Sequence, residues 1–291
     1  MAVRLLGLGD NTVDTYVDQA MQYPGGNAVN VAVLAHRLGA DTGYLGCLGT
    51  DAAGDLLFNA LSTEGVDLSH CRRIEGANAR ALIAHRDGDR RFLGSSPGVR
   101  GRYALADVDL AYVAGFDIVH SSIYSEIEPD LARIRAVAKR LSFDFSDKWS
   151  DAVFARVLPQ IDIAFLSCPG RTDAECAAVL HGCARSGVRL AVATRGADGA
   201  MALADGVLHR QGIASAPVID TLGAGDGFIA AFLTARQAGG GVPAALAHAA
   251  RFAARVCGWQ GAFGHGAPWA DDNGVLASRP VAAGAVTHGP N

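Results

Sequence analysis

The stretch Asp220-Thr221-Leu222-Gly223-Ala224-Gly225-Asp226 runs directly into the apolar segment Gly227-Phe228-Ile229-Ala230-Ala231-Phe232-Leu233. The small residues predict a helix that begins in this loop with its first backbone N–H groups unpaired. Such N–H groups, together with the helix dipole, form a binding site for an anion. Asp226 is unusual there because a carboxylate repels an anion. The arrangement is explained if Asp226 takes a proton from a hydroxyl while the amides stabilise the charge on a transferring phosphoryl group.

The same loop has a simpler interpretation as a helix N-terminus with an ordinary aspartate near its cap. Loops of this kind are common, and the spacing of the residues alone does not separate the two interpretations. The rest of the chain therefore has to decide between them.

Length and composition indicate a globular protein with one large α/β domain, or a domain with a small appendage. Half of the 291 residues are hydrophobic, 19% are charged and the net charge is -4, so there is no global basic signal for nucleic acid. No apolar run reaches membrane-spanning length and residues 1–7 resemble a first strand rather than a signal peptide, so we expect a cytoplasmic protein. The six cysteines form no Cys-x-x-Cys pair, and their apolar neighbours favour buried, reduced thiols.

Short apolar runs alternate with helical stretches along most of the chain. This alternation predicts a buried, mainly parallel central sheet with helices on both faces, a three-layer α/β/α sandwich. The predicted strands are 3–9, 43–48, 117–121, 141–145, 161–166 and 188–193, and the predicted helices include 28–38, 128–140, 151–157 and 172–186.

Two hairpin signals depart from that alternation. Residues 79–86 and 89–94 flank Asp87-Gly88, and their mixed composition suits a small β lid that extends from the main sheet. Residues 201–204 and 207–210 flank a second signal, Asp205-Gly206. We expect one domain over 1–270 with lid segments at about 12–24 and 77–100, followed by a flexible tail over 278–291.

Polar residues follow several predicted strands directly. In open parallel sheets, ligands bind at the carboxyl ends of the strands. The polar residues in question are Asp10, Asn11 and Asp14 after the first strand, Asp144, Ser146, Asp147 and Lys148 after the fourth, Ser167 after the fifth, and Thr194-Arg195-Gly196 after the sixth. Each one singly is compatible with ordinary loop chemistry, but together they predict a site at one edge of the sheet.

A second glycine motif lies near the N-terminus, Gly25-Gly26-Asn27-Ala28-Val29-Asn30. It pairs a two-glycine turn with a helix start, and Asn27 and Asn30 are close to one face of the first turn. Amide side chains donate and accept hydrogen bonds, which suits a polyhydroxylated ligand. Alone, the motif is equally compatible with a capped helix that packs on the sheet.

The two glycine motifs, in this order, resemble the ribokinase-like (PfkB) family of carbohydrate kinases, and the resemblance extends from about Val3 to Pro268. It includes 194–200, similar to the family's nucleotide-site strand and turn, and Gly261-Ala262, similar to its late adenine-side segment. Within the family, the segments 7–11, 23–30 and 142–149 look most like fructoselysine 6-kinases.

The resemblance implies a fold and an activity. The fold is a three-layer sandwich with a β lid over the sugar. The activity is transfer of the γ-phosphoryl group of ATP, with Mg²⁺ and in many relatives a monovalent cation, to a primary hydroxyl, O6 of fructoselysine or a related fructosamine. Family members often dimerise through the lid, so a homodimer is expected by the same resemblance.

The resemblance also implies site residues. Asp226 would be the general base, and the amides of Gly223, Ala224, Gly225 and Asp226 would hold the γ-phosphoryl group. The sugar would contact Asp10, Asn11, Asp14, Gly25, Gly26, Asn27 and Asn30. ATP would contact Lys148, Ser167, Thr194, Arg195, Gly196, Ala197, Gly199, Gly261 and Ala262. A monovalent cation would lie near Asp220 and Thr221.

Some residues depart from the family pattern or have two interpretations. The Asn-x-x-Glu of many relatives is replaced by Ser167-Cys168-Pro169-Gly170, and Glu175 is not an automatic substitute, which leaves Mg²⁺ coordination open. Lys148 stands where many sugar kinases have an arginine; a lysine can still neutralise phosphate as a point charge, and an ordinary surface lysine is almost as compatible with the pattern. Arg91 suits the carboxylate of an amino-acid-conjugated sugar, although a solvated hairpin edge explains it equally. We interpret His120 as structural.

Two alternatives to the fructosamine kinase remain open. One is another sugar or nucleoside kinase on the same scaffold. The other is a non-catalytic sugar- or nucleotide-binding protein, which the missing Asn-x-x-Glu motivates and the intact Asp226 opposes.

Overall fold

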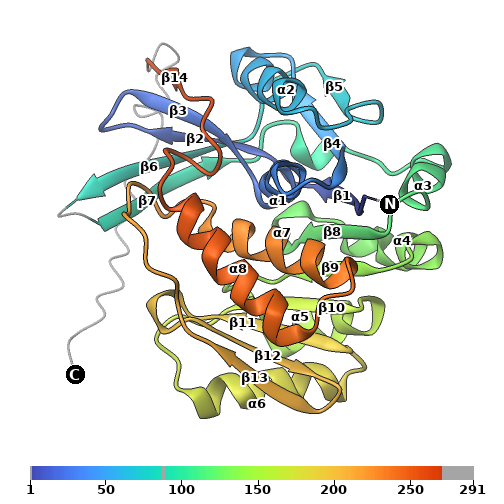
Figure 1. Ribbon diagram of the computed structural model, residues 1–291. Helices are drawn as coiled ribbons and strands as arrows, with labels where there is room; N and C mark the ends of the chain where they lie inside the picture. Colours follow the sequence, from blue (N-terminus) through green and yellow to red (C-terminus); the bar gives the residue numbers. More distant parts are fainter. Residues whose placement is uncertain (1, 87–88, 271–291) are drawn as a thin grey trace.

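The computed structural model describes residues 2–86 and 89–270 and is built on a nine-stranded sheet (Figure 1). The strand order is β13-β12-β11-β10-β9-β8-β1-β4-β5, parallel from β11 to β5, with β12 and β13 antiparallel at one edge. The strands are β1 (Arg4–Gly9), β4 (Asp41–Gly49), β5 (Arg72–Ile74), β8 (Ile118–Ser122), β9 (Leu141–Asp144), β10 (Ile163–Ser167), β11 (Leu190–Thr194), β12 (Ala200–Ala204) and β13 (Val207–Gln211).

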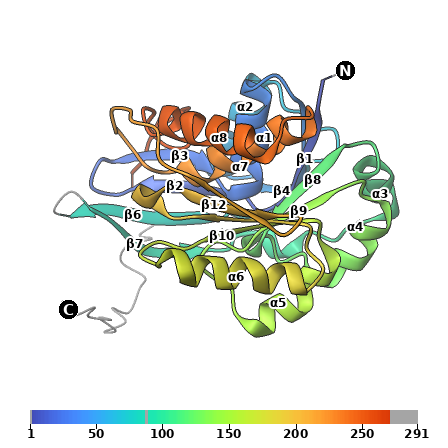
Figure 2. The ribbon, with the colours of Figure 1, turned by 60° about the horizontal axis from the view of Figure 1, so that its bottom comes forward.

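Helices cover both faces of this sheet, as the turned view shows (Figure 2). The alternating side chains Leu5 and Leu6 of β1 enter two different hydrophobic cores, one on each face. The first core contains residues of α1 (Asn27–Arg37), α2 (Ala52–Glu64), α7 (Ala224–Gln237) and α8 (Val242–Val256), and the second contains residues of α3 (Asp107–Val113), α4 (Leu131–Val137), α5 (Asp151–Val157) and α6 (Asp173–Arg185). The predicted three-layer sandwich is confirmed.

One predicted helix is shorter than expected. The segment 128–140 begins with a 3₁₀ turn at Glu128–Asp130, and α4 occupies only Leu131–Val137. Pro129 at the start of the turn lacks an N–H group, which is tolerated in a first turn but not in a helix interior. The backbone then becomes extended at Ala138, ahead of β9.

A smaller five-stranded sheet has the order β14-β3-β2-β6-β7. Its strands are β2 (Thr12–Tyr16), β3 (Met21–Gly25), β6 (Arg80–Arg86), β7 (Asp89–Ser96) and β14 (Ala267–Pro268). It is made from the segments in which we expected a lid, with the late strand β14 added against β3. The turn Asp87-Gly88 and the expected tail over 278–291 lie outside the described residues.

The small sheet is joined to the loop that precedes α7. Tyr16, Tyr23 and Ile83 form a small buried cluster, and Leu222 packs against it. The hydroxyl of Tyr16 also donates a hydrogen bond to Asp220 Oδ2 at 2.5 Å. The small sheet thus contacts the segment that leads to Asp226 by both a hydrophobic contact and a hydrogen bond.

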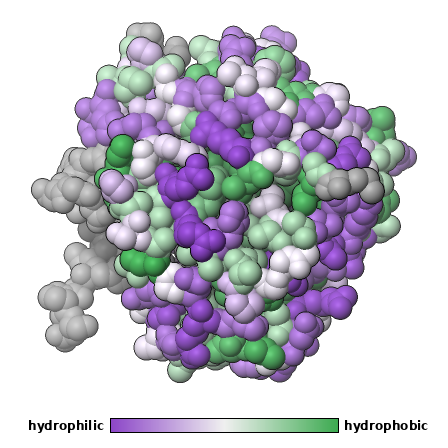
Figure 3. Space-filling model, viewed as in Figure 1, coloured by the Kyte–Doolittle hydropathy of each residue, from purple (hydrophilic) through white to green (hydrophobic). Residues whose placement is uncertain are grey.

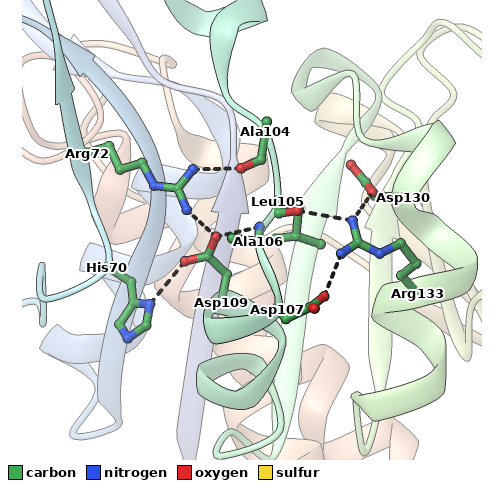
Figure 4. A network of polar contacts seen from close by, with 9 residues as sticks. All are labelled: His70, Arg72, Ala104, Leu105, Ala106, Asp107, Asp109, Asp130 and Arg133. Atoms are coloured by element: carbon green, nitrogen blue, oxygen red, sulfur yellow. Dashed lines mark hydrogen bonds and ion pairs between the residues drawn. The ribbon is translucent and has the colours of Figure 1, made fainter.

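A polar network fixes the start of α3 (Figure 4). The buried carboxylate of Asp109 accepts hydrogen bonds from Arg72 and from the backbone N–H of Ala106, and His70 lies 3.1 Å away. On the exposed side of the same helix, Arg133 pairs with Asp107. The network ties α3 to β5 and to α4, far along the sequence from either glycine motif.

The surface and the cysteines agree with an ordinary globular chain. Hydrophilic and hydrophobic residues are interspersed on the face seen in Figure 3. Among the described residues, no helix combines the length and the apolarity needed to span a membrane. Cys47, Cys168, Cys176 and Cys183 are buried free thiols, as expected, whereas Cys71 and Cys257 are only partly buried, and burial raises the pKa of Cys168 to about 12.

Candidate active site

The loop before α7 has the geometry of an anion site. Gly223 is the N-cap of α7 with φ 74°, a conformation that favours glycine. A Cβ atom at Gly223 would lie 2.4 Å from the Cβ of Ala262, so no larger residue fits. Within the described part of the chain, the N–H groups of Gly225 and Asp226 have no hydrogen-bond acceptor, and the space around Gly225 is open. These donors are available to an external anion.

The carboxylate of Asp226 lies between two amides of α1. Asn27 donates from Nδ2 to Asp226 Oδ1 at 2.8 Å, and Asn30 donates from Nδ2 to Asp226 Oδ2 at 2.6 Å. Both glycine motifs therefore meet at one point, because α1 and α7 pack side by side on the same face of the sheet. The Oδ1 atom of Asn30 is buried and has no partner among the described residues, so it is left to accept a hydrogen bond from a ligand.

The site holds several carboxylates whose ionisation is coupled. The pKa of Asp226 is raised to about 6, mainly by burial; the nearby Asp10 carboxylate also raises it, and the Asn30 and Asn27 amides lower it. Burial likewise raises the pKa of Asp144 to about 7, with Asp226 and Asp10 contributing. The Nδ2 group of Asn27 lies 3.0 Å from Asp144 Oδ2, so Asp144 and Asp226 share one amide. A carboxylate with a raised pKa next to free backbone amides suits a general base.

The carboxylate of Asp10 and the amide of Asn11, both expected sugar contacts, have hydrogen-bond partners within the protein. The Asp10 carboxylate accepts hydrogen bonds from the backbone N–H groups of Asn27 and Ala28 and therefore caps α1. It also accepts from the hydroxyls of Ser122 and Ser125, and Asp10 is only 3% exposed. The capping role of this carboxylate was not apparent from the sequence.

The amide of Asn11 is used in the same way. It donates from Nδ2 to Tyr44 Oη and to the Cys47 carbonyl, and its Oδ1 accepts from Asn78. These bonds link the end of β1 to β4 and to the base of β6. The expected sugar contacts of Asp10 and Asn11 stay predictions.

Asp14, another expected sugar contact, packs against the glycine turn. It lies on β2, and an added Cβ at Gly25 would be 2.1 Å from its Oδ2 atom, so the carboxylate rests directly on the glycine turn. Gly26 has φ 104°, and a Cβ there would meet the backbone of Asn11 at 2.5 Å. Both glycines are thus needed for close packing of the turn between β3 and α1.

Several residues expected to contact ATP line the ends of β10 and β11. Thr194 ends β11, and Gly196 and Ala197 form a 3₁₀ turn. Gly199 has φ 83°, and a Cβ atom there would lie 2.1 Å from the Gln211 carbonyl oxygen.

Gly261 donates its N–H to Asp220 Oδ2, and Ala262 packs under Gly223. Gly261 and Ala262 therefore support the anion loop.

Other expected contacts point elsewhere. The guanidinium of Arg195 binds Asp173 and the Arg171 carbonyl at the start of α6, so this side chain has a structural task. Lys148 is 60% exposed and lies 3.7 Å from Asp147, as a surface lysine would. The carbonyl of Ser167 accepts a hydrogen bond from Trp149, and the Arg91 side chain lies outside the described part.

Asp220, the carboxylate of the predicted monovalent cation site, already has hydrogen-bond partners within the protein. The Asp220 carboxylate already accepts hydrogen bonds from Tyr16 Oη, Leu222 N and Gly261 N. Thr221 is exposed, and its carbonyl accepts from Ala224 N. Glu175, the other open question, caps α6 by accepting from the N–H and hydroxyl of Thr172, so it is not directed at the site.

Two site residues were not selected from the sequence. Asp144 appeared only among the polar residues after predicted strands, and His120 was interpreted as structural. The signal for Asp144 was its position at the end of β9, but only the structure places it beside Asp226. His120 is completely buried, and its Nε2 lies 2.9 Å from Asn27 Oδ1. Its sequence neighbours do not indicate this contact.

Comparison with known proteins agrees with the geometry. The family model described as pfkB family carbohydrate kinase matches residues 3–268. The chain is 40% identical over 276 residues to the fructosamine kinase FrlD of Bacillus subtilis (strain 168), covering 94% of this chain and 97% of the relative. It is 36% identical over 259 residues to the fructoselysine 6-kinase of Escherichia coli (strain K12), covering 89% and 99%.

Solved structures share the fold. The Arabidopsis thaliana ribokinase complexed with ribose and ATP superimposes with a TM-score of 0.78 at 22% identity, covering 90% of this chain and 94% of that chain. The ATP-bound fructokinase of Xylella fastidiosa gives a TM-score of 0.74 at 22% identity, covering 89% and 94%. The loop, the paired asparagines and these similarities lead to one conclusion: this chain belongs to the pfkB family of carbohydrate kinases.

Proposed function

We propose that this carbohydrate kinase phosphorylates O6 of fructoselysine or of a related fructosamine with ATP. The similarity to a fructosamine kinase and a fructoselysine 6-kinase over about nine-tenths of the chain supports the substrate class. The observation that carries the activity is the Asp226 carboxylate, held by two asparagine amides directly beside unpaired backbone N–H groups.

The proposed reaction uses these groups in one step. The 6-hydroxyl oxygen attacks the γ-phosphorus, its proton passes to Asp226, and the bond from the γ-phosphorus to the bridging oxygen breaks to release ADP. The N–H groups of Gly225 and Asp226, with the dipole of α7 behind them, stabilise the charge on the transferring group. Phosphoryl transfer requires mainly alignment and charge stabilisation, which these groups supply.

The acidic character of the site suits a fructosamine. Its secondary amine is protonated near neutral pH, and the site contains the carboxylates of Asp144 and Asp226, which share the Asn27 amide. Asn30 Oδ1 is available to accept from a sugar hydroxyl or from the ammonium group. The second sheet, whose strands β2 and β3 hold Asp14 and Gly25, would cover the sugar and exclude water that competes for ATP.

Magnesium would enter with ATP. Within residues 2–86 and 89–270 there is no cluster of three or more metal-binding side chains. Mg²⁺ commonly retains water and binds through nucleotide phosphates with one or two carboxylates, so it does not require such a cluster. When bound, it would neutralise phosphate charge. The occupied carboxylate of Asp220 gives us no basis for proposing a K⁺ site there.

We also propose that two copies associate through the small sheet. Strand β7 is an edge strand, and Phe92 and Leu93 on it are 67% and 40% exposed. Exposed apolar side chains on an edge strand favour pairing with another chain.

A substrate panel tests the proposed function. Purified protein, ATP and Mg²⁺ are mixed with fructoselysine, the glycine-derived fructosamine, fructose, ribose or adenosine, and ADP release is followed in a coupled assay. We expect the highest kcat/KM with a fructosamine, and ³¹P NMR of the product should place the phosphate on O6. Turnover of ribose, fructose or adenosine without turnover of a fructosamine would overturn the substrate assignment. Ligand binding without ADP release for any of them would instead indicate a binding protein.

A further inference from the structure

The buried side chain of His120 connects the central sheet with α1. It is on β8, is completely buried, and contacts two polar groups from different elements. Its Nδ1 lies 2.5 Å from the hydroxyl oxygen of Ser142 on β9, and its Nε2 lies 2.9 Å from Asn27 Oδ1 on α1. Burial lowers the pKa of His120 to about 3, so the ring is neutral and carries one proton.

The contacts of Asn27 determine which ring nitrogen carries that proton. The Nδ2 group of Asn27 donates its two hydrogens to Asp226 Oδ1 and Asp144 Oδ2. Asn27 Oδ1 therefore faces His120, and because a carbonyl oxygen only accepts, Nε2 of the ring must be the donor. Nδ1 is then an acceptor, and the hydroxyl of Ser142 donates to it. One continuous set of hydrogen bonds runs from Ser142 through His120 and Asn27 to Asp226.

We propose that His120 is a positioning residue that holds the Asn27 amide in the orientation that presents its NH₂ group to Asp226. A rotation of the amide by 180° would turn Asn27 Oδ1 toward Asp226 and Asp144, and Nδ2 toward the Nε2 proton of His120. Both contacts would then be unfavourable. His120 thereby maintains the hydrogen bond from Asn27 Nδ2 to Asp226 while Asp226 accepts the proton of the sugar hydroxyl. This inference rests on the proposed function of Asp226.

The groups around Asp226 define what removal of His120 would change. Asp226 faces Asn27 and Asn30 of α1, Asp144 at the end of β9, and Asp10 after β1. The Asn27 and Asn30 amides lower its pKa, whereas burial and Asp10 raise it. If Asn27 becomes free to rotate, Asp226 loses one of the two amides that favour its ionised form. The pKa of the base then rises.

Three variants separate positioning from packing. His120→Leu removes both ring nitrogens, and His120→Gln retains an NH₂ group that can donate to Asn27. Ser121→Ala is the matched control, because Ser121 is a buried neighbour on β8 whose hydroxyl donates to the Leu8 carbonyl and does not reach Asn27. kcat, sugar KM and the pH dependence of kcat/KM are measured for each variant with the sugar that the wild-type protein phosphorylates best.

We expect His120→Leu to lower kcat by about 10- to 100-fold, the loss typical of a misaligned catalytic group, with sugar KM changed less than about fivefold. The acid limb of its pH profile should move to higher pH. His120→Gln should recover most of kcat and the wild-type limb, and Ser121→Ala should match the wild type.

Equal losses in His120→Leu and His120→Gln with an unmoved acid limb would overturn the inference and indicate packing alone. A wild-type profile in His120→Leu would do the same. If His120→Leu does not fold, His120→Met takes its place, because methionine fills irregular space and likewise cannot donate a hydrogen bond to Asn27. An unmoved acid limb in His120→Met would overturn the inference. Failure of the proposed function would appear separately, as a wild-type protein that releases no ADP or an Asp226→Asn variant that retains turnover.

Discussion

At the scale of single residues, the candidate site depends on Asp226, an aspartate whose burial disfavours its ionised form. Two amides stabilise the carboxylate, while burial and neighbouring carboxylates oppose its ionisation. The resulting pKa is close to neutral pH, where a carboxylate is mostly ionised and still accepts a proton readily.

Replacing Asp226 with asparagine tests the base directly. We expect kcat to fall by at least about 10³-fold, because the proton then has no acceptor at the reacting oxygen. Sugar affinity, measured by calorimetry, should remain within about tenfold, since the base acts mainly in the transition state. Turnover close to that of the wild type would contradict the assignment.

The raised pKa of Asp226 predicts a pH dependence. Only the ionised carboxylate accepts a proton, so kcat/KM should be constant well above pH 6 and should fall as the pH drops through about 6. An aspartate with its ordinary pKa would lose half of this activity only near pH 4. The measurement is kcat/KM between pH 5 and 9, with circular dichroism at each pH to confirm that the fold persists.

The close approach of Gly223 to Ala262 predicts that Gly223→Ala is harmful. The new methyl group would clash with Ala262, and the positive φ would be strained, which together should lower the free energy of unfolding by about 1–3 kcal/mol and displace the anion loop. Gly212→Ala is the control, because a Cβ there has open space. Thermal unfolding and kcat should be lowered in the first variant and unchanged in the second. Equal behaviour of the two variants would refute the argument.

At the scale of elements, the two glycine motifs begin helices whose N-termini are used differently. The N-terminus of α1 is occupied by the Asp10 carboxylate, which accepts from two backbone N–H groups. At the N-terminus of α7, the N–H groups of Gly225 and Asp226 have no acceptor among the described residues. The same local chemistry thus anchors one helix and leaves donors for an anion at the other.

The anchoring of α3 by Asp109 leads to a stability prediction. Asp109 is buried and its pKa is lowered, because hydrogen bonds from Ala106, His70 and Arg72 outweigh the effect of burial. Asp109→Asn should lower the free energy of unfolding by about 1–3 kcal/mol at pH 7 by weakening the contact with Arg72. Asp107→Asn, an exposed position on the same helix, should change it by less than about 0.5 kcal/mol.

The sign of the pH dependence follows from the lowered pKa. Stability from a carboxylate with a depressed folded-state pKa is fully present above its ordinary value of about 4 and is lost as the pH falls through the folded-state pKa. The difference between wild type and Asp109→Asn in urea unfolding should therefore shrink from pH 7 toward pH 3. A difference that grows as the pH falls would contradict the proposed network.

At the scale of the whole molecule, the small sheet contacts the loop before α7. Tyr16 in the small sheet bonds to Asp220, and Leu222 packs into the cluster of Tyr16, Tyr23 and Ile83. The loop that carries the phosphoryl site is consequently sensitive to the position of the small sheet. Leu222 gives this loop an apolar contact with the small sheet.

The exposed edge of the small sheet predicts the assembly state. If two copies pair through β7, Phe92→Asp should convert a dimer into a monomer, because a charge would be buried at the contact. Light scattering coupled to size-exclusion chromatography measures the mass of each species. Val108→Asp, which changes an equally exposed apolar residue on α3, should leave the dimer intact. A monomeric wild-type protein would contradict the proposed association.

The layers of the fold, and the glycine loop that leads to Asp226, could be predicted from the sequence alone. Apolar runs of strand length alternating with amphipathic helices have few ways to bury their surface, so the sandwich could be predicted from periodicity. The glycines before α7 and Asp226 could be predicted because they are contiguous and local backbone chemistry explains them. The hairpin at 79–94 followed from turn residues in the same way.

Only the tertiary structure decided what each polar side chain contacts. Asp10, Asn11 and Asp14 are close in sequence, yet the first caps a helix, the second ties three strands together, and the third lies on the glycine turn. His120 and Asn27 are 93 positions apart, and their contact exists because β8 and α1 pack together. Hydrogen bonds between distant elements depend on packing distances of a few ångströms, which a one-dimensional pattern does not encode.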